Sequence, residues 1–469
     1  MASSLYSRFA LAALIFLFCP HAFSDAPVST PLLDAVYADD TVTAVDLIES
    51  GSDVNEANRY GIVPLILACR NGNGDIVSAL LRYGADPDAK GSGGESALMI
   101  ASRTGLLVPV QLLLKEGASL ETTERKGQTA LMWAAAEGHD EVVTLLIGST
   151  ADPEKRLKSG FTAIHFAARN GHLKTVECLL DAGVPVGDAI AVDKVIGKSP
   201  PKGTTPLRLA VENGHFDLAC FLIERGADPN EQASGFAPLH VLTWVRKPHR
   251  GDGDNGLPPP KIQSELTSLA FAKKIIEEFG AEVNLKLKSG SGGGNRLGTR
   301  GASPFLLAAQ RADLDYMKLL ESLGADVTLA NDDSTTPFLA ASGVGSSAPE
   351  EEAGNELERL EVLPWLLERG AKINAKNRFG DTSVHGAAYK NVPGVVQFLD
   401  ESGADITLWN TKNKKRWTPL LIAQGFRPGN FKPSQATIEA IEKIMRSHGV
   451  TPPAAPVRPV VGAPKKYVP

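Results

Sequence analysis

The stretch FTAIHFAARNGH, Phe161 to His172, places two histidines seven residues apart. In a helix this spacing puts both rings on one face, about two turns apart, where they could serve a metal or catalytic site. His165 stands inside the phrase TAIHFAA, and His172 follows a glycine. A chemical role predicts that this setting is unique, whereas a structural role predicts that it recurs along the chain.

The setting recurs at a constant interval. Phrases of the same pattern begin at residues 30, 63, 96, 129 and 162, so four successive steps are 33 residues each. Further copies begin at residues 205, 237, 303, 336, 382 and 418, which makes eleven units. Within a unit the apolar spacing predicts two short amphipathic helices, followed by a turn phrase such as YGADPDA. Small residues such as Ala167 and Ala168 mark the first helix, and large pairs such as Leu179-Leu180 mark the second.

These landmarks resemble the ankyrin repeat, whose 33-residue unit opens its first helix with T-P-L-H-x-A. The resemblance covers residues 26–450. It implies an all-α repeat solenoid of helix-turn-helix units with β-hairpin loops, stacked into a curved and elongated array. The family's function is recognition of other proteins, so the resemblance implies a protein partner and no enzyme activity.

The register explains the histidines. One set occupies the fourth position of the opening phrase: His165, His240 and His385. A second set follows the glycine that closes the first helix: His139, His172 and His215. Residues repeated in register belong to the repeat, and the resemblance implies that the fourth-position histidines bond between neighbouring repeats. We therefore predict no catalytic, metal-binding or cofactor-binding residues.

Both ends of the chain differ from the repeats. Arg8, an apolar run over 9–18 and the small-residue site at 22–24 predict a secretory signal peptide over residues 1–24. A lipid anchor at Cys19 is the weaker alternative, since bulky Phe18 precedes it. The apolar run is too short to span a bilayer, and we predict no membrane span. Residues 451–469 are rich in proline and predict an extended, disordered tail, preceded by a helix over 434–447 that caps the last repeat.

The remaining cysteines indicate an exported protein without a disulfide scaffold. Cleavage of the signal leaves Cys69, Cys178 and Cys220, and an odd number argues against a framework of disulfides. The register predicts that Cys69 and Cys178 are core residues and that Cys220 is partly exposed. The expected location is the bacterial periplasm, with the extracellular space as the alternative.

Four inserts interrupt the repeats, at residues 184–203, 246–264, 288–301 and 342–356. They are rich in Gly, Pro, Ser and charge, and loops added to a solenoid often mark its binding side. The second helix of repeat seven is expected at 265–279. The insert SGSGGGNRLG lacks the Lys-Ser/Thr ending of a phosphate loop, and Asp252-x-Asp254 opens no complete calcium loop.

The resemblance also implies a binding surface on the concave side, formed by hairpin tips and the ends of first helices. The chain as a whole has 48 basic and 54 acidic residues, but the positions implied by the register carry a basic excess with interleaved aromatic residues. We predict Trp133 to be a packing residue. The predicted partner-binding residues are Arg59, Tyr60, Arg70, Arg103, Arg125, Lys126, Lys158, Phe161, Arg169, Lys202, Phe236, Trp244, Arg300, Arg311, Arg378, Phe379, Tyr389, Lys390 and Trp417.

The sequence thus predicts a monomeric, non-enzymatic interaction scaffold of the cell envelope that binds an acidic protein surface. The inserts of repeats seven and nine would add specificity. A net charge of -6 gives no reason to expect nucleic acid. Two alternatives remain open: a non-catalytic subunit or regulator of an exported enzyme, and a secreted factor that acts on host proteins.

Overall fold

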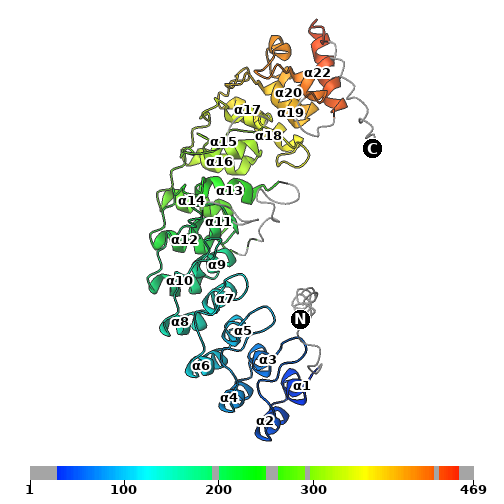
Figure 1. Ribbon diagram of the computed structural model, residues 1–469. Coiled ribbons are helices and arrows are strands. Elements are labelled where there is room, and N and C mark those ends of the chain that lie inside the picture. The colour runs from blue at the N-terminus through cyan, green and yellow to red at the C-terminus, as the bar shows by residue number, and fades with distance from the viewer. Residues whose placement is uncertain are drawn as a thin grey trace, which may run out of the picture. The chain divides into compact units, whose positions relative to one another are not determined.

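A computed structural model describes residues 29–192, 200–249, 262, 264–290, 296–426 and 433–453 of the chain. The predicted signal peptide, most of the proline-rich tail and parts of three inserts lie outside these ranges. The chain divides into two compact units (Figure 1). Unit 1 comprises residues 1–167 and 174–184, and unit 2 comprises residues 168–173 and 185–469.

The described residues form eleven helix pairs. The first helices of the pairs are α1 (Pro31–Tyr37), α3 (Pro64–Asn71), α5 (Ala97–Thr104), α7 (Ala130–Glu137), α9 (Ala163–Asn170), α11 (Pro206–Glu212), α13 (Pro238–Arg246), α15 (Pro304–Gln310), α17 (Pro337–Ala341), α19 (Ser383–Lys390) and α21 (Pro419–Ala423). The second helices are α2 (Thr41–Glu49), α4 (Gly74–Arg82), α6 (Leu107–Lys115), α8 (Asp140–Gly148), α10 (Leu173–Asp181), α12 (Phe216–Glu224), α14 (Ser268–Glu277), α16 (Leu314–Ser322), α18 (Glu356–Glu368), α20 (Pro393–Glu401) and α22 (Gln435–Ser447). A short 3-10 helix, η1 (Ile406–Asn410), precedes α21.

Each first helix begins one residue after the repeated phrase begins, and most of these phrases open with a Thr or Ser whose side chain caps the helix. Thr129, for example, accepts a hydrogen bond from the backbone N–H of Met132 and so satisfies one free donor at the start of α7. Gly138 ends the same helix in the left-handed conformation, with φ of 82°. Within the described ranges the only β pairing is a bridge between Lys90 and Ser96, so the expected hairpins are mostly irregular turns.

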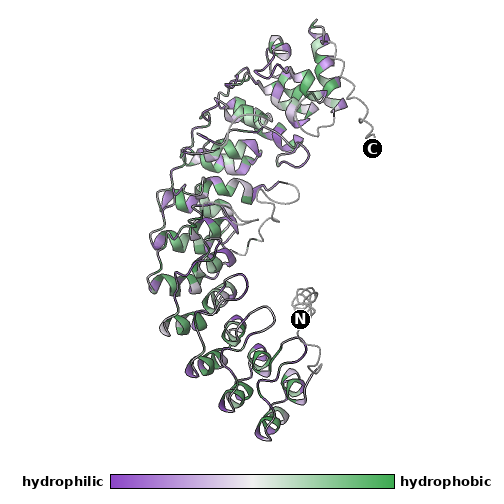
Figure 2. Ribbon diagram, in the orientation of Figure 1, coloured by the Kyte–Doolittle hydropathy of each residue, from purple (hydrophilic) through white to green (hydrophobic). Residues whose placement is uncertain are grey.

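Within each unit, first helices pack on first helices and second helices pack on second helices. In unit 1, α1, α3, α5 and α7 form one row and α2, α4, α6 and α8 form the other. Figure 2 shows the apolar faces turned towards the space between neighbouring helices. Ala134 and Ala135 in α7 and Leu146 in α8 are fully buried. Small residues allow the first helices to approach closely, and the all-α repeat solenoid predicted from the sequence is confirmed.

The histidines after the glycine join neighbouring repeats. His139 donates from Nε2 to the backbone carbonyl of Arg103, at 2.9 Å, in the preceding repeat. Its ring lies so close to Gly105 that a Cβ there would come within 2.3 Å of Nδ1. His215 makes the equivalent contact with the carbonyl of Arg169, at 3.1 Å. These rings cap the carboxyl ends of α5 and α9, where the free carbonyls need donors.

The fourth-position histidines are buried, and two of them, His240 and His385, also bond between repeats, as the resemblance implied. His240 donates from Nε2 to the carbonyl oxygens of Leu285 and Ala302, at 3.1 and 3.2 Å. His385 lies beside its own cap residue Thr382 and donates to the carbonyl of Trp417, at 3.3 Å. The structural interpretation of these two residues is confirmed.

Burial of His240 makes the stability of unit 2 depend on pH. Burial lowers the pKa of His240 to about 4, and Nδ1 has no hydrogen-bond partner among the described residues. The unfolded chain binds a proton near pH 6.5, whereas the folded chain does not until about pH 4. Stability contributed by the neutral ring is therefore complete above pH 6.5 and is lost as the pH falls towards 4.

We expect acidification from pH 7 to pH 4 to lower the free energy of unfolding by up to about 3 kcal/mol through His240 alone. Urea unfolding followed by tryptophan fluorescence measures this change. The variant His240→Gln keeps an amide donor for the two carbonyls but does not titrate, so its loss should be smaller by that amount. Equal losses in both proteins would contradict the assignment.

Two expectations about the cysteines are wrong. Cys220, predicted to be partly exposed, is 4% exposed, because it lies one turn after Phe216 on the face of α12 that meets α14. The ring of Phe216 stacks there on Phe271, at 5.1 Å between centroids. Cys178, predicted to be a core residue, is only half-buried. Cys69 is buried as predicted, and burial raises the pKa of its thiol to about 12.

Two helices that were predicted outside the regular spacing, in repeat seven and at the end of the last repeat, are present in the structure. Helix α14 lies inside the range expected for the second helix of repeat seven. Helix α22 is the second helix of the last pair, and it packs on α20 and α21.

Candidate functional site

The predicted partner-binding residues fall into three groups by exposure. The exposed ones are Arg59, Tyr60, Arg70, Arg103, Arg125, Lys126, Lys158, Arg169, Lys202, Arg300 and Arg378. The half-buried ones are Phe236, Trp244, Phe379 and Trp417. The buried ones are Phe161, Arg311, Tyr389 and Lys390. Only the first two groups can offer contact area to a partner.

The four buried residues are corrections to the predicted surface. The ring of Phe161 packs against Phe166, with centroids 5.1 Å apart. The guanidinium of Arg311 donates to the carbonyl of Lys247 at 2.6 Å, at the end of α13. The hydroxyl of Tyr389 accepts from Asn413 Nδ2 at 3.0 Å. Lys390 is covered by the repeat-nine insert.

Lys390 shows why register alone mispredicts exposure in unit 2. Its ammonium donates to the carbonyl of Glu352 at 2.9 Å and lies 3.8 Å from the carboxylate of the same residue. The insert thus folds over a position that is exposed in a regular repeat. Two other predicted cations of unit 2 are exposed but paired, Arg300 with Asp332 at 3.1 Å and Arg378 with Asp333 at 3.7 Å. The predicted basic face is therefore partly neutralised in unit 2.

In unit 1 the predicted residues that are exposed form a basic and aromatic surface. We use the term basic-aromatic face for eight residues at its hairpin turns and on its first helices: Arg59, Tyr60, Arg70, Arg103, Arg125, Lys126, Trp133 and Lys158. None of the six cations forms an ion pair within the part of the chain that the structure describes. Arg70 and Arg103 lie in the last turns of α3 and α5, where a positive charge also offsets the helix dipole.

Aromatic rings hold two of these guanidinium groups in place. Arg59 lies over the ring of Tyr60, at 4.8 Å from its centroid, and Arg103 lies over Trp133, at 5.1 Å. Trp133, predicted to be a packing residue, is half-buried, and its indole N–H has no acceptor among the described residues. Sequence reasoning left Trp133 out of the face because it did not place Arg103 one repeat earlier against the same ring.

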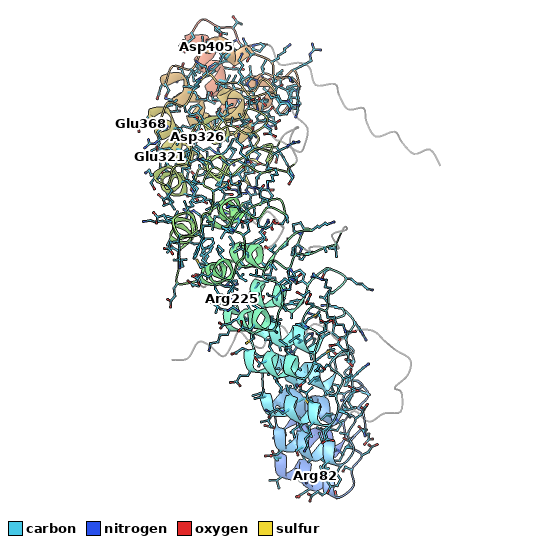
Figure 3. All side chains as sticks on the ribbon, turned by 90° about the vertical axis from the view of Figure 1, so that its left-hand side faces the viewer. Arg82, Arg225, Glu321, Asp326, Glu368 and Asp405 are labelled. Carbon is cyan, nitrogen blue, oxygen red and sulfur yellow. The ribbon has the colours of Figure 1, made fainter. Side chains whose placement is uncertain are left out.

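Three acidic side chains lie on one side of unit 2. Figure 3 shows Glu321, Asp326 and Glu368 on the side formed by α16, α18 and the turns that follow them. Arg369 donates to Glu321 at 2.6 Å and lies 3.8 Å from the ring centroid of Trp365.

The inserts of repeats seven and nine meet in unit 2, which the sequence did not reveal. The backbone N–H of Ala353 donates to His249 Nδ1 at 3.0 Å, and Lys247 pairs with Glu358. Beside these contacts lies a cavity of about 510 Å³, which we call the insert cleft. Its walls include Arg208, Phe236, Trp244, Arg296 and Arg311. Three of these, Phe236, Trp244 and Arg311, were predicted as partner-binding residues.

Across the described ranges, no three His, Cys, Asp or Glu side chains come close enough to hold a metal ion. In the same ranges no helix has the length and apolar character needed to cross a bilayer.

Comparison with known proteins shows the same repeat. A family model of three ankyrin repeat copies matches residues 32–124, 65–157 and 131–233. The chain is 30% identical over 285 residues to Ankyrin repeat and SOCS box protein 16 of Homo sapiens, covering 54% of this chain and 59% of that protein. It is 23% identical over 240 residues to Ankyrin repeat and SOCS box protein 6 of Homo sapiens, covering 49% and 52% respectively. The match therefore spans little more than half of these relatives.

A bacterial relative is covered more fully. The Putative ankyrin repeat protein YahD of Escherichia coli (strain K12) is 30% identical over 168 residues, which are 32% of this chain and 80% of that protein.

Proposed function

Because the chain belongs to the ankyrin repeat family, a family of protein-interaction modules, we propose that it is a non-enzymatic scaffold of the cell envelope that binds an acidic surface of a partner protein. The single observation that carries this proposal is the basic-aromatic face of unit 1, in which six cations form no ion pair with any residue that the structure describes. The export signal predicted over residues 1–24 supports the location.

Physical chemistry favours recognition of a protein by this face. Charges that stay unpaired in the free protein raise the rate of encounter with an opposite charge. Arginine and aromatic side chains are also enriched among the residues that dominate binding energies. Because Tyr60 and Trp133 already orient Arg59 and Arg103, less side-chain entropy is lost when a partner binds.

The experiment is a crosslinked pull-down with the chain from Asp25 onward, followed by affinity measurement on the captured partner. The test variant carries Arg70→Glu, Arg103→Glu and Lys126→Glu. We expect it to bind at least about 100-fold more weakly than the wild type, because each reversal replaces attraction with repulsion. Wild-type affinity should also fall as salt rises, since these charges are exposed to screening.

A matched control variant distinguishes an effect of the basic-aromatic face from an effect of the change in net charge. The control variant carries Arg82→Glu, Lys115→Glu and Lys174→Glu, three exposed cations of unit 1 outside the face. Arg82 and Lys115 lie in the last turns of α4 and α6, so the helix-dipole cost resembles that of Arg70 and Arg103. We expect its affinity to change less than about threefold. Equal losses in both variants would rule out the face as the recognition surface.

A further inference from the structure

The insert cleft has the dimensions of a ligand site. Its volume of about 510 Å³ falls in the range of sites for small organic groups. All of its walls belong to unit 2: α11, α13, the carboxyl end of α15 and residues 345–353 of the repeat-nine insert contribute to them. The cleft is thus separate from the basic-aromatic face.

An arginine replaces the repeat's histidine in the wall of this cleft. Arg208 occupies the fourth position of TPLRLAV, where His240 stands in the next repeat, and it is 7% exposed. Its Nη1 donates to Ser234 Oγ at 2.9 Å, and a carboxylate oxygen of Glu212 lies 3.4 Å from Nε. The replacement puts a permanent cation at a position where three other repeats have a histidine ring and the rest an apolar side chain.

Two aromatic rings accompany Arg208. The guanidinium lies 5.4 Å from the ring centroid of Trp244 and 5.8 Å from that of Phe236. The two rings meet edge to face, with centroids 5.0 Å apart. Aromatic rings lining a cleft can attract a cationic ligand, but here both rings already contact a cation of the protein. A second cation would be repelled by Arg208, so the cleft favours an anion.

Two buried donors point to the kind of anion. Trp244 Nε1 has no hydrogen-bond acceptor among the described residues, and Arg208 Nε has only the Glu212 carboxylate, which lies at 3.4 Å and outside hydrogen-bond geometry. Buried N–H groups are nearly always paired, so an acceptor at this place would be stabilised. Arg296, on the same wall, is exposed and forms no ion pair or hydrogen bond within the described ranges.

The acidic residues of the cleft do not cancel this preference. Glu352 is used internally: one carboxylate oxygen accepts from the backbone N–H groups of Ser347 and Ala348, at 2.6 and 2.9 Å. Glu212 pairs with Arg208, and the exposed Glu351 is the other acidic side chain that opposes Arg208, Arg296 and Arg311. Leu297 and Leu307 add apolar area beside the two rings.

We propose that the insert cleft binds a carboxylate carried on a flat or apolar body. The carboxylate accepts from Arg208 and Trp244, and the body packs on Phe236 and the two leucines. The carrier is either a free aromatic acid or an acidic-aromatic segment of a protein. This proposal rests on unit 2 and stands independently of the partner proposed for unit 1.

The test is calorimetric titration of the full mature chain with phenylacetate and with the peptide acetyl-Phe-Asp-amide. We expect saturable binding of at least one probe. Phenylacetamide, which has the same shape without the charge, should bind at least about tenfold more weakly than phenylacetate. Binding of the acid alone identifies a free ligand, and binding of the peptide alone identifies a protein segment.

Variants locate the site. Trp244→Phe keeps a ring and removes the N–H donor, and we expect it to weaken binding about tenfold. Arg296→Gln, at an exposed position, should weaken it several-fold. Trp417→Phe, at a half-buried position elsewhere in unit 2, and the triple reversal on the unit 1 face should both bind like the wild type. Absence of binding of both probes, equal binding of phenylacetamide, or wild-type affinity in Trp244→Phe would overturn the proposal.

Discussion

Replacing Arg359 with methionine should lower the free energy of unfolding by about 3–5 kcal/mol. Arg359 is 1% exposed, and its guanidinium is surrounded by backbone carbonyls. Nε donates to Gly354 at 2.9 Å, Nη1 to Ala341 at 2.5 Å and Nη2 to Gln310 at 3.0 Å. One side chain thus ties the repeat-nine insert to the carboxyl ends of α15 and α17.

The size of the effect follows from what the variant leaves behind. Gln310 and Ala341 end their helices, so their carbonyls have no donor within the helix and lie at the negative end of its dipole. Methionine fills a similar volume but donates no hydrogen bond, and the carbonyls stay buried without a partner. Burial lowers the pKa of Arg359 to about 10, with Glu352 and Glu358 opposing the shift, so the side chain is charged at neutral pH.

Urea unfolding followed by tryptophan fluorescence measures this loss, since four of the five tryptophans lie in unit 2. The variant Arg359→Lys keeps the charge but not the planar fork, and we expect an intermediate loss. Glu361→Ala, at an exposed position on the same helix, serves as the control and should stay within about 0.5 kcal/mol of the wild type. A loss below about 1 kcal/mol in Arg359→Met would refute the role assigned to the guanidinium.

The regular features of this fold could be predicted because they are local. A cap such as Thr129 and a closing glycine such as Gly138 act within a few residues, so the repeated phrase is sufficient to place a helix. The resemblance to the ankyrin repeat implied that His240 and His385 bond to the next repeat, as they do. A residue whose environment repeats every 33 positions has the same neighbours each time, and one well-understood copy explains the others.

Some of the errors arise where an insert or a neighbouring turn changes those neighbours. Lys390 is in the correct register for an exposed cation, but the repeat-nine insert covers it. Arg300 is exposed as predicted, yet Asp332 of the following turn pairs with it. The spacing of apolar residues in the sequence does not predict which charged side chain a loop places beside a given residue. The six cations of the basic-aromatic face could be predicted in unit 1, where the repeats are regular, whereas several predicted cations of unit 2 are paired or covered.

One signal of the insert architecture was present in the sequence. Arg359 shares a helical stripe with Val362, Leu363 and Leu366, all of which are buried. A single arginine on an otherwise apolar stripe predicts a buried charge that needs several acceptors. The sequence could not name those acceptors, because they are main-chain carbonyls from three separate segments.

The second large effect is expected at Asp313, which is 2% exposed and caps the start of α16. Its two carboxylate oxygens accept from Arg246 Nε and Nη2, at 2.7 and 2.9 Å. The third nitrogen of Arg246 donates to Ser268 Oγ at 2.7 Å, so this arginine joins the end of α13 to α14 and α16. Removing the carboxylate leaves a largely buried cation without its partner and removes a helix cap.

We expect Asp313→Ala to lower the free energy of unfolding by about 3–5 kcal/mol, and Asp313→Asn, which keeps a cap, to cost less. The double variant Arg246→Met/Asp313→Ala should lose clearly less than the sum of the single variants, because no unpaired charge remains. Additive losses in this cycle would show that the two side chains act separately.

Arg246 also precedes two residues that hold the repeat-nine insert. Lys247 pairs with Glu358, and His249 accepts a hydrogen bond from the backbone N–H of Ala353. Asp313→Ala should therefore weaken phenylacetate binding in the insert cleft, and unchanged affinity would separate the cleft from the contact that anchors its wall.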